Sequence, residues 1–123
     1  MRVRSILPAT KQTFVDDRDA RELVILNLFV AIQACLDLAT HWVADAGWAM
    51  PRRYADVFEA LAEHSVIPRD LAARLGDAAG FRNLVAHQYA VLDPGLVYAI
   101  ASSGVRDLDM FCEMLARRIE SGA

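Results

Sequence analysis

The chain has 123 residues and a formal net charge of −3, and apolar residues make up 55% of it. This composition excludes an intrinsically disordered chain, which needs low hydrophobicity and high net charge, and the acidic balance excludes a generally basic nucleic-acid-binding protein. The length predicts a single domain over 1–123 with a short or irregular segment at 1–15, and the apolar surplus suggests an interface with another subunit.

The first long helix is expected over 16–46, since Asp16 and Asp17 suit a helix N-terminus and Gly47 suits the position after its end. Its middle, 23–36, carries no charged residue and is apolar on nearly all sides, so it needs cover from its own bundle and from a second subunit. The stretch is shorter than the roughly 18–20 apolar residues that cross a bilayer. We also expect no signal peptide before it, because no apolar segment follows Arg2 and Arg4. We therefore expect a cytoplasmic protein without a membrane segment.

Three further helices are expected, over 53–64, 68–91 and 93–119. Pro68 opens the second of these, and Asp93 followed by Pro94 is a strong start signal for the last. The last helix keeps one apolar register across 102–104, so we expect it to be continuous there. The positions predicted to face the core in the three helices are Tyr54, Val57, Phe58 and Leu61, then Leu71, Leu75, Ala79 and Leu84, then Val97, Ile100, Gly104, Leu108, Phe111, Leu115 and Ile119. Together the four main helices predict an all-α, up-and-down bundle.

The three histidines, His41, His64 and His87, lie on three different predicted helices. No pair has the spacing of a helical metal site, so we expect no metal ion and no other cofactor. Asp37 precedes His41 by four residues on the same helix face, which leaves open either a structural hydrogen bond or a supporting role at an active site. His64 is expected to be a surface residue near a helix C-terminus.

Polar side chains concentrate in 81–89, within the otherwise apolar third helix. Asn83 and His87 are four residues apart and share a face, while Arg82 and Tyr89 are seven apart and share another. Arg82 and His87 are separated by about 140° around the helix axis and by about 7.5 Å along it. Their side chains could converge on one phosphate in a cleft; the alternative is a solvated polar stripe on a purely structural bundle.

This segment resembles the Arg-x4-His-x-Tyr motif of the HepT toxins, a group within the HEPN superfamily. The resemblance extends to the flanks: 30–41 is similar to the long apolar helix of the family, 54–63 to its next helix and 92–98 to the start of its last helix. It covers about 16–119. The chain departs from the family in having only a short segment before the long helix, and in carrying Gln88 where relatives often have an acidic residue.

The resemblance implies a HEPN-like fold and a metal-independent endoribonuclease toxin of a type VII-like toxin–antitoxin pair, in which the ribose 2′-hydroxyl attacks the adjacent phosphate. It implies catalytic roles for His87 in acid–base chemistry and for Arg82 at the phosphate, with Asn83 and Tyr89 in support. The implied partner is an MntA-like nucleotidyltransferase antitoxin. This partner would silence the nuclease by transferring AMP onto Tyr89, whose added bulk and charge would repel RNA.

A homodimer is expected on two grounds. Cleavage of this kind is easiest with a base and a separate acid, whereas one chain supplies a single motif histidine, His87. Two chains would bring together two copies of His87 and of Arg82 and would also cover the apolar surplus. A single histidine that shuttles its proton is the alternative. A second function also fits the resemblance: a non-catalytic, dimeric HEPN-like partner of a nucleotidyltransferase, which would not require Arg82 and His87 together.

Overall fold

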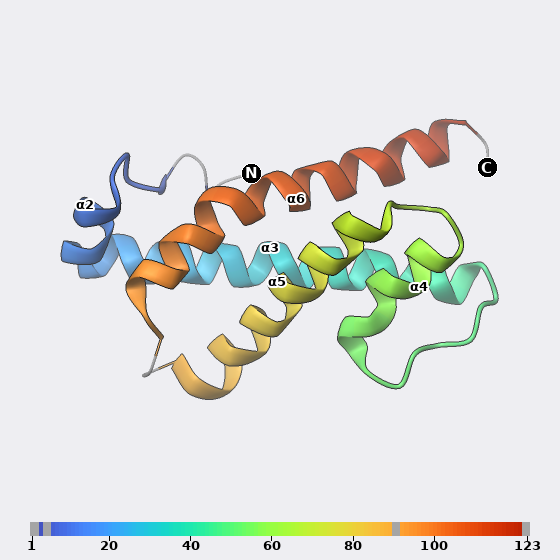
Figure 1. Cartoon of the computed structure of the whole chain (residues 1–123), viewed down its shortest axis with the longest axis horizontal. Coiled ribbons are helices and arrows are strands. Elements are labelled where there is room, and N and C mark those ends of the chain that lie inside the picture. The colour runs from blue at the N-terminus through green and yellow to red at the C-terminus, as the bar shows by residue number, and fades with distance from the viewer. Residues whose placement is uncertain (1–2, 4–5, 90–91, 122–123) are drawn as a thin grey trace.

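The structure is a computed structural model that describes residue 3 and residues 6–89 and 92–121 (Figure 1). Every regular element in these ranges is helical, which confirms the all-α prediction. In chain order the elements are α2 (Lys11–Asp16), α3 (Arg18–Asp45), the 3-10 helix η1 (Tyr54–Asp56), α4 (Val57–Glu63), α5 (Arg69–Gln88) and α6 (Pro94–Glu120). The predicted end of the third helix, 90–91, lies outside the described residues.

Helix α3 runs the length of the molecule, and the other helices are arranged around it (Figure 1). It packs against α4, α5 and α6. Helix α5 runs back across α3 and α6 returns along it, so the three long helices alternate in direction as the up-and-down prediction requires. The short α4 lies beside the C-terminal end of α3, and α2 lies beside its start. The start of the motif, at Arg82, therefore lies against a helix that comes much earlier in the sequence.

The helix ends follow the predicted capping signals. Asp17 is the N-cap of α3, where its side chain accepts a hydrogen bond from the Ala20 backbone N–H at 3.1 Å. Gly47 follows the end of α3 with φ of +75°, a conformation that favours glycine. The Asp93 side chain accepts from the Gly95 backbone N–H at 3.1 Å, with Pro94 at the first position of α6. Helix α6 continues through 102–104 without a break, as the apolar register predicts.

The core is apolar and centred on aromatic and branched side chains from the α-helices α2 to α6, whereas η1 contributes no buried residue. The rings of Phe58 in α4 and Phe111 in α6 meet edge to face, with centroids 5.4 Å apart. Two predicted core positions are wrong: Ile119 is 67% exposed and Tyr54 is 42% exposed. Leu84, Ile100 and Gly104 are only partly buried. The buried row of α6 consists of Val97, Ala101, Val105, Leu108, Phe111 and Leu115.

One side of α3 remains exposed although it is apolar. Leu26 is 60% exposed, Val30 57% and Leu38 47%, and with Leu23 and Ala34 they form what we call the α3 stripe. An 18-residue window of this helix has a mean hydropathy of 2.0, and 39% of that window is buried. By length and composition alone α3 is thus apolar enough to cross a membrane. The sequence analysis predicts that a second subunit covers this stripe. The absence of a membrane segment stays a prediction.

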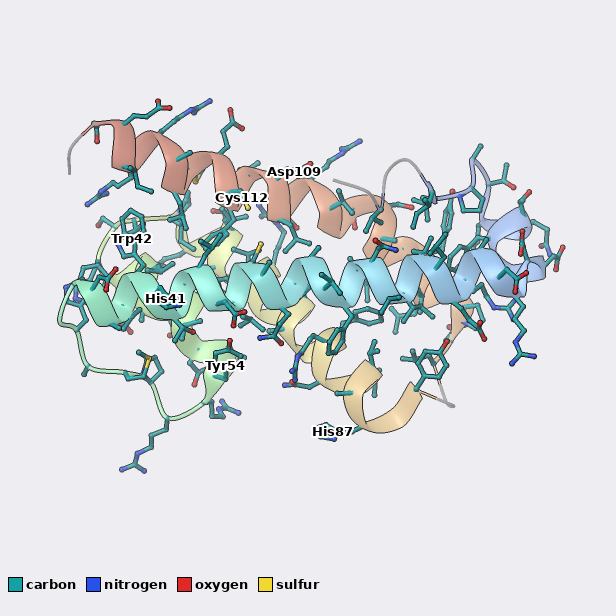
Figure 2. All side chains as sticks on the ribbon, turned by 180° about the vertical axis from the view of Figure 1, so that it is seen from behind. His41, Trp42, Tyr54, His87, Asp109 and Cys112 are labelled. Atoms are coloured by element: carbon teal, nitrogen blue, oxygen red, sulfur yellow. The ribbon has the colours of Figure 1, made fainter. Side chains whose placement is uncertain are left out.

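The two cysteines lie against each other between α3 and α6. The sulfur atoms of Cys35 and Cys112 are 3.9 Å apart, both thiols are free, and Cys35 is buried while Cys112 is half-buried. Cys112 is labelled on α6 in Figure 2. Their mutual hydrogen bond lowers the pKa of Cys112 to about 7 and, together with burial, raises the pKa of Cys35. Of the two thiols, Cys112 is therefore the one expected to ionise first, with Cys35 as the hydrogen-bond donor to its thiolate.

This pairing predicts how alkylation by iodoacetamide depends on pH. The thiolate is the reacting species, so the rate at Cys112 should rise through pH 7 and level off by about pH 8, whereas an ordinary thiol with a pKa near 8.5 keeps rising beyond pH 9. Peptide mass spectrometry measures the rate at each site. Cys35→Ala should move the midpoint up toward the ordinary value, and Cys112→Ser should leave only the slow reaction of buried Cys35. A midpoint near 8.5 in the unmodified chain would contradict the assignment.

Candidate active site

The Arg82 side chain leaves α5 toward α3, where three contacts hold its guanidinium. Its Nε donates a hydrogen bond to Oε1 of Gln33 at 2.8 Å. Its Nη1 donates to Oδ1 of the neighbouring Asn83 at 3.0 Å, and its central carbon lies 5.0 Å from the centroid of the Phe29 ring. Arg82 is half-buried. The contacts fix both the position and the plane of the guanidinium.

Gln33 belongs to a second group of polar side chains, which we call the Gln33–Asp37–Tyr54 network. The amide nitrogen of Gln33 donates to Oδ1 of Asp37 at 3.0 Å and to the hydroxyl oxygen of Tyr54 at 3.1 Å. The Tyr54 hydroxyl in turn donates to the same Asp37 oxygen at 2.5 Å. These hydrogen bonds lower the pKa of Asp37, while partial burial and then the bond to Asp37 raise the pKa of Tyr54.

His87 lies on a different side of α5 from Arg82. Its imidazole is exposed, and it points away from α3 (Figure 2). The structure therefore does not bring the two predicted catalytic side chains together within one chain. The reason is the angle between their positions on the helix combined with the hydrogen bond that turns Arg82 toward Gln33.

The two supporting residues also differ in their surroundings. Asn83 is exposed, and its described hydrogen bond is to Arg82, not to His87 as the shared helix face suggests. Tyr89 is the C-cap of α5, and its side chain is 49% exposed. It lines a pocket of about 210 Å³ whose other walls include Arg18 and Arg21 from the first turns of α3. Tyr89 thus faces α3, as Arg82 does, but it lies nearer to the N-terminal end of α3 than Arg82 does.

The other histidines lie toward the C-terminal end of α3. His41 is exposed and lines an open pocket of about 560 Å³ with Trp42, Trp48 and Arg118 among its walls. The His64 ring stacks on Trp48, with centroids 3.6 Å apart and planes 7° apart, and its Nδ1 lies 2.9 Å from the Ala60 carbonyl oxygen. Within the described part of the chain, no group of three or more His, Cys, Asp or Glu side chains could hold a metal ion. Independence from metal stays a prediction.

Sequence reasoning missed Gln33 and Tyr54 as neighbours of the motif arginine. The signal for Gln33 was its position as a polar residue inside the charge-free stretch 23–36. Tyr54 gave no separate signal, because its spacing from Val57, Phe58 and Leu61 matches a buried helix face. Asp37 was paired with His41 by spacing, whereas its described hydrogen bonds come from Gln33 and Tyr54.

Comparison with known proteins identifies the family of this chain. The profile of the family described as "Ribonuclease HepT-like" matches residues 1–115. The chain belongs to the HepT-like family. A relative from Shewanella oneidensis, named mRNA nuclease HepT, is 28% identical over 102 residues, which cover 83% of this chain and 77% of the relative.

Solved structures of HepT-like toxins have the same fold. The tri-AMPylated HEPN toxin of Shewanella oneidensis in complex with MNT antitoxin superposes with a TM-score of 0.85 at 26% identity, covering 94% of this chain and 86% of that one. A variant of an MntA toxin–antitoxin complex gives a TM-score of 0.86 at 25% identity, covering 94% and 88%. The bundle described above is therefore the HepT-like fold, in a family of ribonucleases.

Proposed function

We propose that this chain is the endoribonuclease toxin of a type VII-like toxin–antitoxin pair and that it cleaves RNA without a metal ion. The observation that carries the proposal is the anchored guanidinium of Arg82 on the same helix as the exposed imidazole of His87. Arginine has five N–H groups, and two of those on Arg82 make the described hydrogen bonds, which leaves three to bind a phosphate. This function requires a cytoplasmic location, where the RNA is.

The proposed reaction uses the RNA's own nucleophile. A base removes the proton of the ribose 2′-hydroxyl, whose oxygen attacks the adjacent phosphorus, and the bond from phosphorus to the 5′-oxygen breaks. An acid protonates that leaving oxygen, giving a cyclic phosphate and a 5′-hydroxyl end. Arg82 stabilises the charge that develops on the phosphate oxygens, and His87 supplies the acid–base group.

A homodimer supplies the second acid–base group, and the α3 stripe is the surface on which we propose that it forms. Leu26 and Val30 of the stripe lie three residues from Phe29 and Gln33, the two α3 residues that hold Arg82, so they adjoin them on the helix surface. A two-fold axis on the stripe therefore brings two Arg82 side chains toward one site. The stripe adjoins Arg82, whereas His87 extends into solvent from another side of α5. In the dimer we propose that one His87 acts as base and its copy as acid.

The dimer is tested by placing charge in the stripe. The double variant Leu26→Glu/Val30→Glu buries two carboxylates in each subunit if the interface forms there, so it should sediment as a monomer and lose RNA cleavage. Leu96→Glu, at an equally apolar but separate exposed site on α6, is the matched control and should behave as the unmodified protein. Analytical ultracentrifugation at micromolar concentration gives the mass. A monomeric unmodified chain that still cleaves RNA would rule out the composite site.

Cleavage itself is tested with the two motif residues. We expect His87→Ala and Arg82→Ala each to reduce cleavage of a labelled RNA by about 10²–10⁴-fold, because each removes a group that acts on the transition state. Arg106→Ala removes an exposed arginine outside the motif and should retain activity. Addition of EDTA should have no effect. Full activity in either motif variant, or inhibition by EDTA, would contradict the mechanism, and no cleavage by the unmodified chain would favour the non-catalytic alternative.

Control by a nucleotidyltransferase antitoxin is proposed to act through Tyr89. The phenol is half-exposed in a pocket with Arg18, Arg21 and Glu22. Glu22 pairs with Arg18 at 3.2 Å, so Arg21 carries the net positive charge that favours the approach of a nucleotide phosphate. The tyrosyl oxygen attacks the α-phosphorus of ATP, pyrophosphate leaves, and the phenol proton passes to a base of the transferase. The added phosphodiester charge and adenosine then oppose RNA binding, which depends on phosphate contacts.

Co-expression with the cognate nucleotidyltransferase should add one or more AMP units at Tyr89 and stop RNA cleavage. Intact-mass measurement and peptide mapping detect the additions. Tyr89→Phe cannot be modified there and should remain a nuclease in the presence of the transferase, whereas Tyr98→Phe, which removes a half-buried tyrosine hydroxyl elsewhere, should still be silenced. An inactive co-expressed chain with unmodified Tyr89 would mean that the antitoxin acts by masking instead.

A further inference from the structure

Gln33 has a hydrogen-bond partner of fixed type on each side. Arg82 can only donate, and the ionised Asp37 carboxylate can only accept. The amide of Gln33 lies between them, and its oxygen accepts from Arg82 at 2.8 Å while its nitrogen donates to Asp37 at 3.0 Å. The amide therefore has one orientation that satisfies both neighbours, and Asp37 determines which end of it Arg82 meets.

Tyr54 closes the network from a third part of the chain. Its hydroxyl accepts from Gln33 at 3.1 Å and donates to Asp37 at 2.5 Å. Gln33 and Asp37 come from α3, Tyr54 from η1 and Arg82 from α5, so the motif helix is linked to two elements that the motif does not contain. The pKa of Asp37 is lowered and that of Tyr54 is raised, so from weakly acidic to weakly basic pH both keep the protonation states that the network requires.

The neutral amide between Arg82 and Asp37 also has an electrostatic consequence. A carboxylate in direct contact with Arg82 would neutralise the guanidinium and compete with a phosphate for its N–H groups. Gln33 holds the side chain through one N–H group without adding a charge at that contact. The cation is thus oriented and still available to an anion.

We propose that Gln33, Asp37 and Tyr54 are positioning residues for Arg82, fixing its guanidinium where the RNA phosphate meets it. This inference rests on the proposed ribonuclease function and assigns roles to three residues outside the motif. The role of Asp37 is to orient Gln33 as a hydrogen-bond acceptor, and Tyr54 holds that acceptor in place. The required feature of Asp37 is therefore the oxygen that accepts these bonds, not its charge.

This distinction can be tested with two variants of one residue. Asp37→Asn keeps a side-chain oxygen that accepts from Gln33 and Tyr54, so kcat for RNA cleavage should stay within about threefold of the unmodified value. Asp37→Ala removes the acceptor, and kcat should fall by about tenfold to a hundredfold, the size of effect expected from a misplaced catalytic group, with KM changing much less. Asp45→Ala, an exposed aspartate on the same helix, is the matched control and should leave both constants unchanged.

Two further variants test whether Asp37 acts on Arg82 through the amide of Gln33. Gln33→Leu should lower kcat as Asp37→Ala does, because Arg82 loses its acceptor. Gln33→Glu places a carboxylate against Arg82, so it should raise KM for RNA most strongly at low salt, where phosphate binding is tightest. Thermal unfolding followed by circular dichroism shows whether each variant is folded. A folded Gln33→Leu with unchanged kcat would overturn the proposal.

Action through Arg82 is tested by combining variants. In single-turnover cleavage with excess enzyme, Asp37→Ala should cause no further loss when added to Arg82→Ala, because there is no guanidinium left to position. Additive losses would show that Asp37 acts independently and would overturn the inference while leaving the ribonuclease function intact. If Arg82→Ala itself retains full cleavage, the proposed function fails instead, so the two failures are distinguishable.

Discussion

Helix α3 has more apolar surface than one chain of this size covers, and the rest of the structure is organised around that constraint. One side of the helix packs against α4, α5 and α6 and forms much of the core. Its exposed side carries Leu26, Val30 and Leu38, each close to half exposed or more. The polar residues Gln33 and Asp37 lie between these two sides, where Gln33 binds Arg82 of the motif helix and Asp37 binds Gln33. The same helix thus supplies the core, the proposed dimer surface and the residues that hold Arg82.

The arrangement of the motif residues depends on long-range contacts more than on the motif spacing. Arg82 and His87 occupy one continuous helix, which fixes their backbone positions relative to each other. Their side chains nevertheless diverge, because Gln33 and Phe29 on α3 hold Arg82 on one side while His87 extends into solvent on another. A site that uses both on one phosphate is therefore easier to build from two chains than from one. This geometry and the apolar side of α3 independently favour a dimer.

Local signals predicted the helices well. Asp17, Gly47 and Asp93 mark helix ends through capping hydrogen bonds or a backbone conformation that involves only a few neighbouring residues, so the sequence alone locates them. Tyr54 shows where this reasoning stops. Its ring fits an apolar repeat, yet its hydroxyl binds Asp37, which lies on another helix. An analysis of helical periodicity counts tyrosine as an apolar residue. It cannot predict that the tyrosine hydroxyl bonds to a residue of another helix.

The direction of a long side chain is likewise decided outside its own helix. Asn83 and His87 share a face, so spacing alone suggests that they interact. The Arg82 side chain instead turns toward Gln33, and its guanidinium also donates a hydrogen bond to the side-chain oxygen of Asn83. The motif could be found from residue types and spacing, whereas its hydrogen-bond partners could not, because they depend on how α5 crosses α3.

If Tyr54 helps to position Arg82 as proposed, the loop between α3 and η1 also matters for activity, because it determines where Tyr54 lies. Trp48 stacks on His64 and so pins this loop to the end of α4, and the loop delivers Tyr54 to Asp37. An insertion or deletion in 48–53 would leave every letter of the Arg-x4-His-x-Tyr motif unchanged while separating the proposed network from Arg82. Genome surveys that count nucleases by the motif alone would then include degenerate copies. The length of this loop and the residues at the positions of Gln33 and Asp37 offer a stricter criterion.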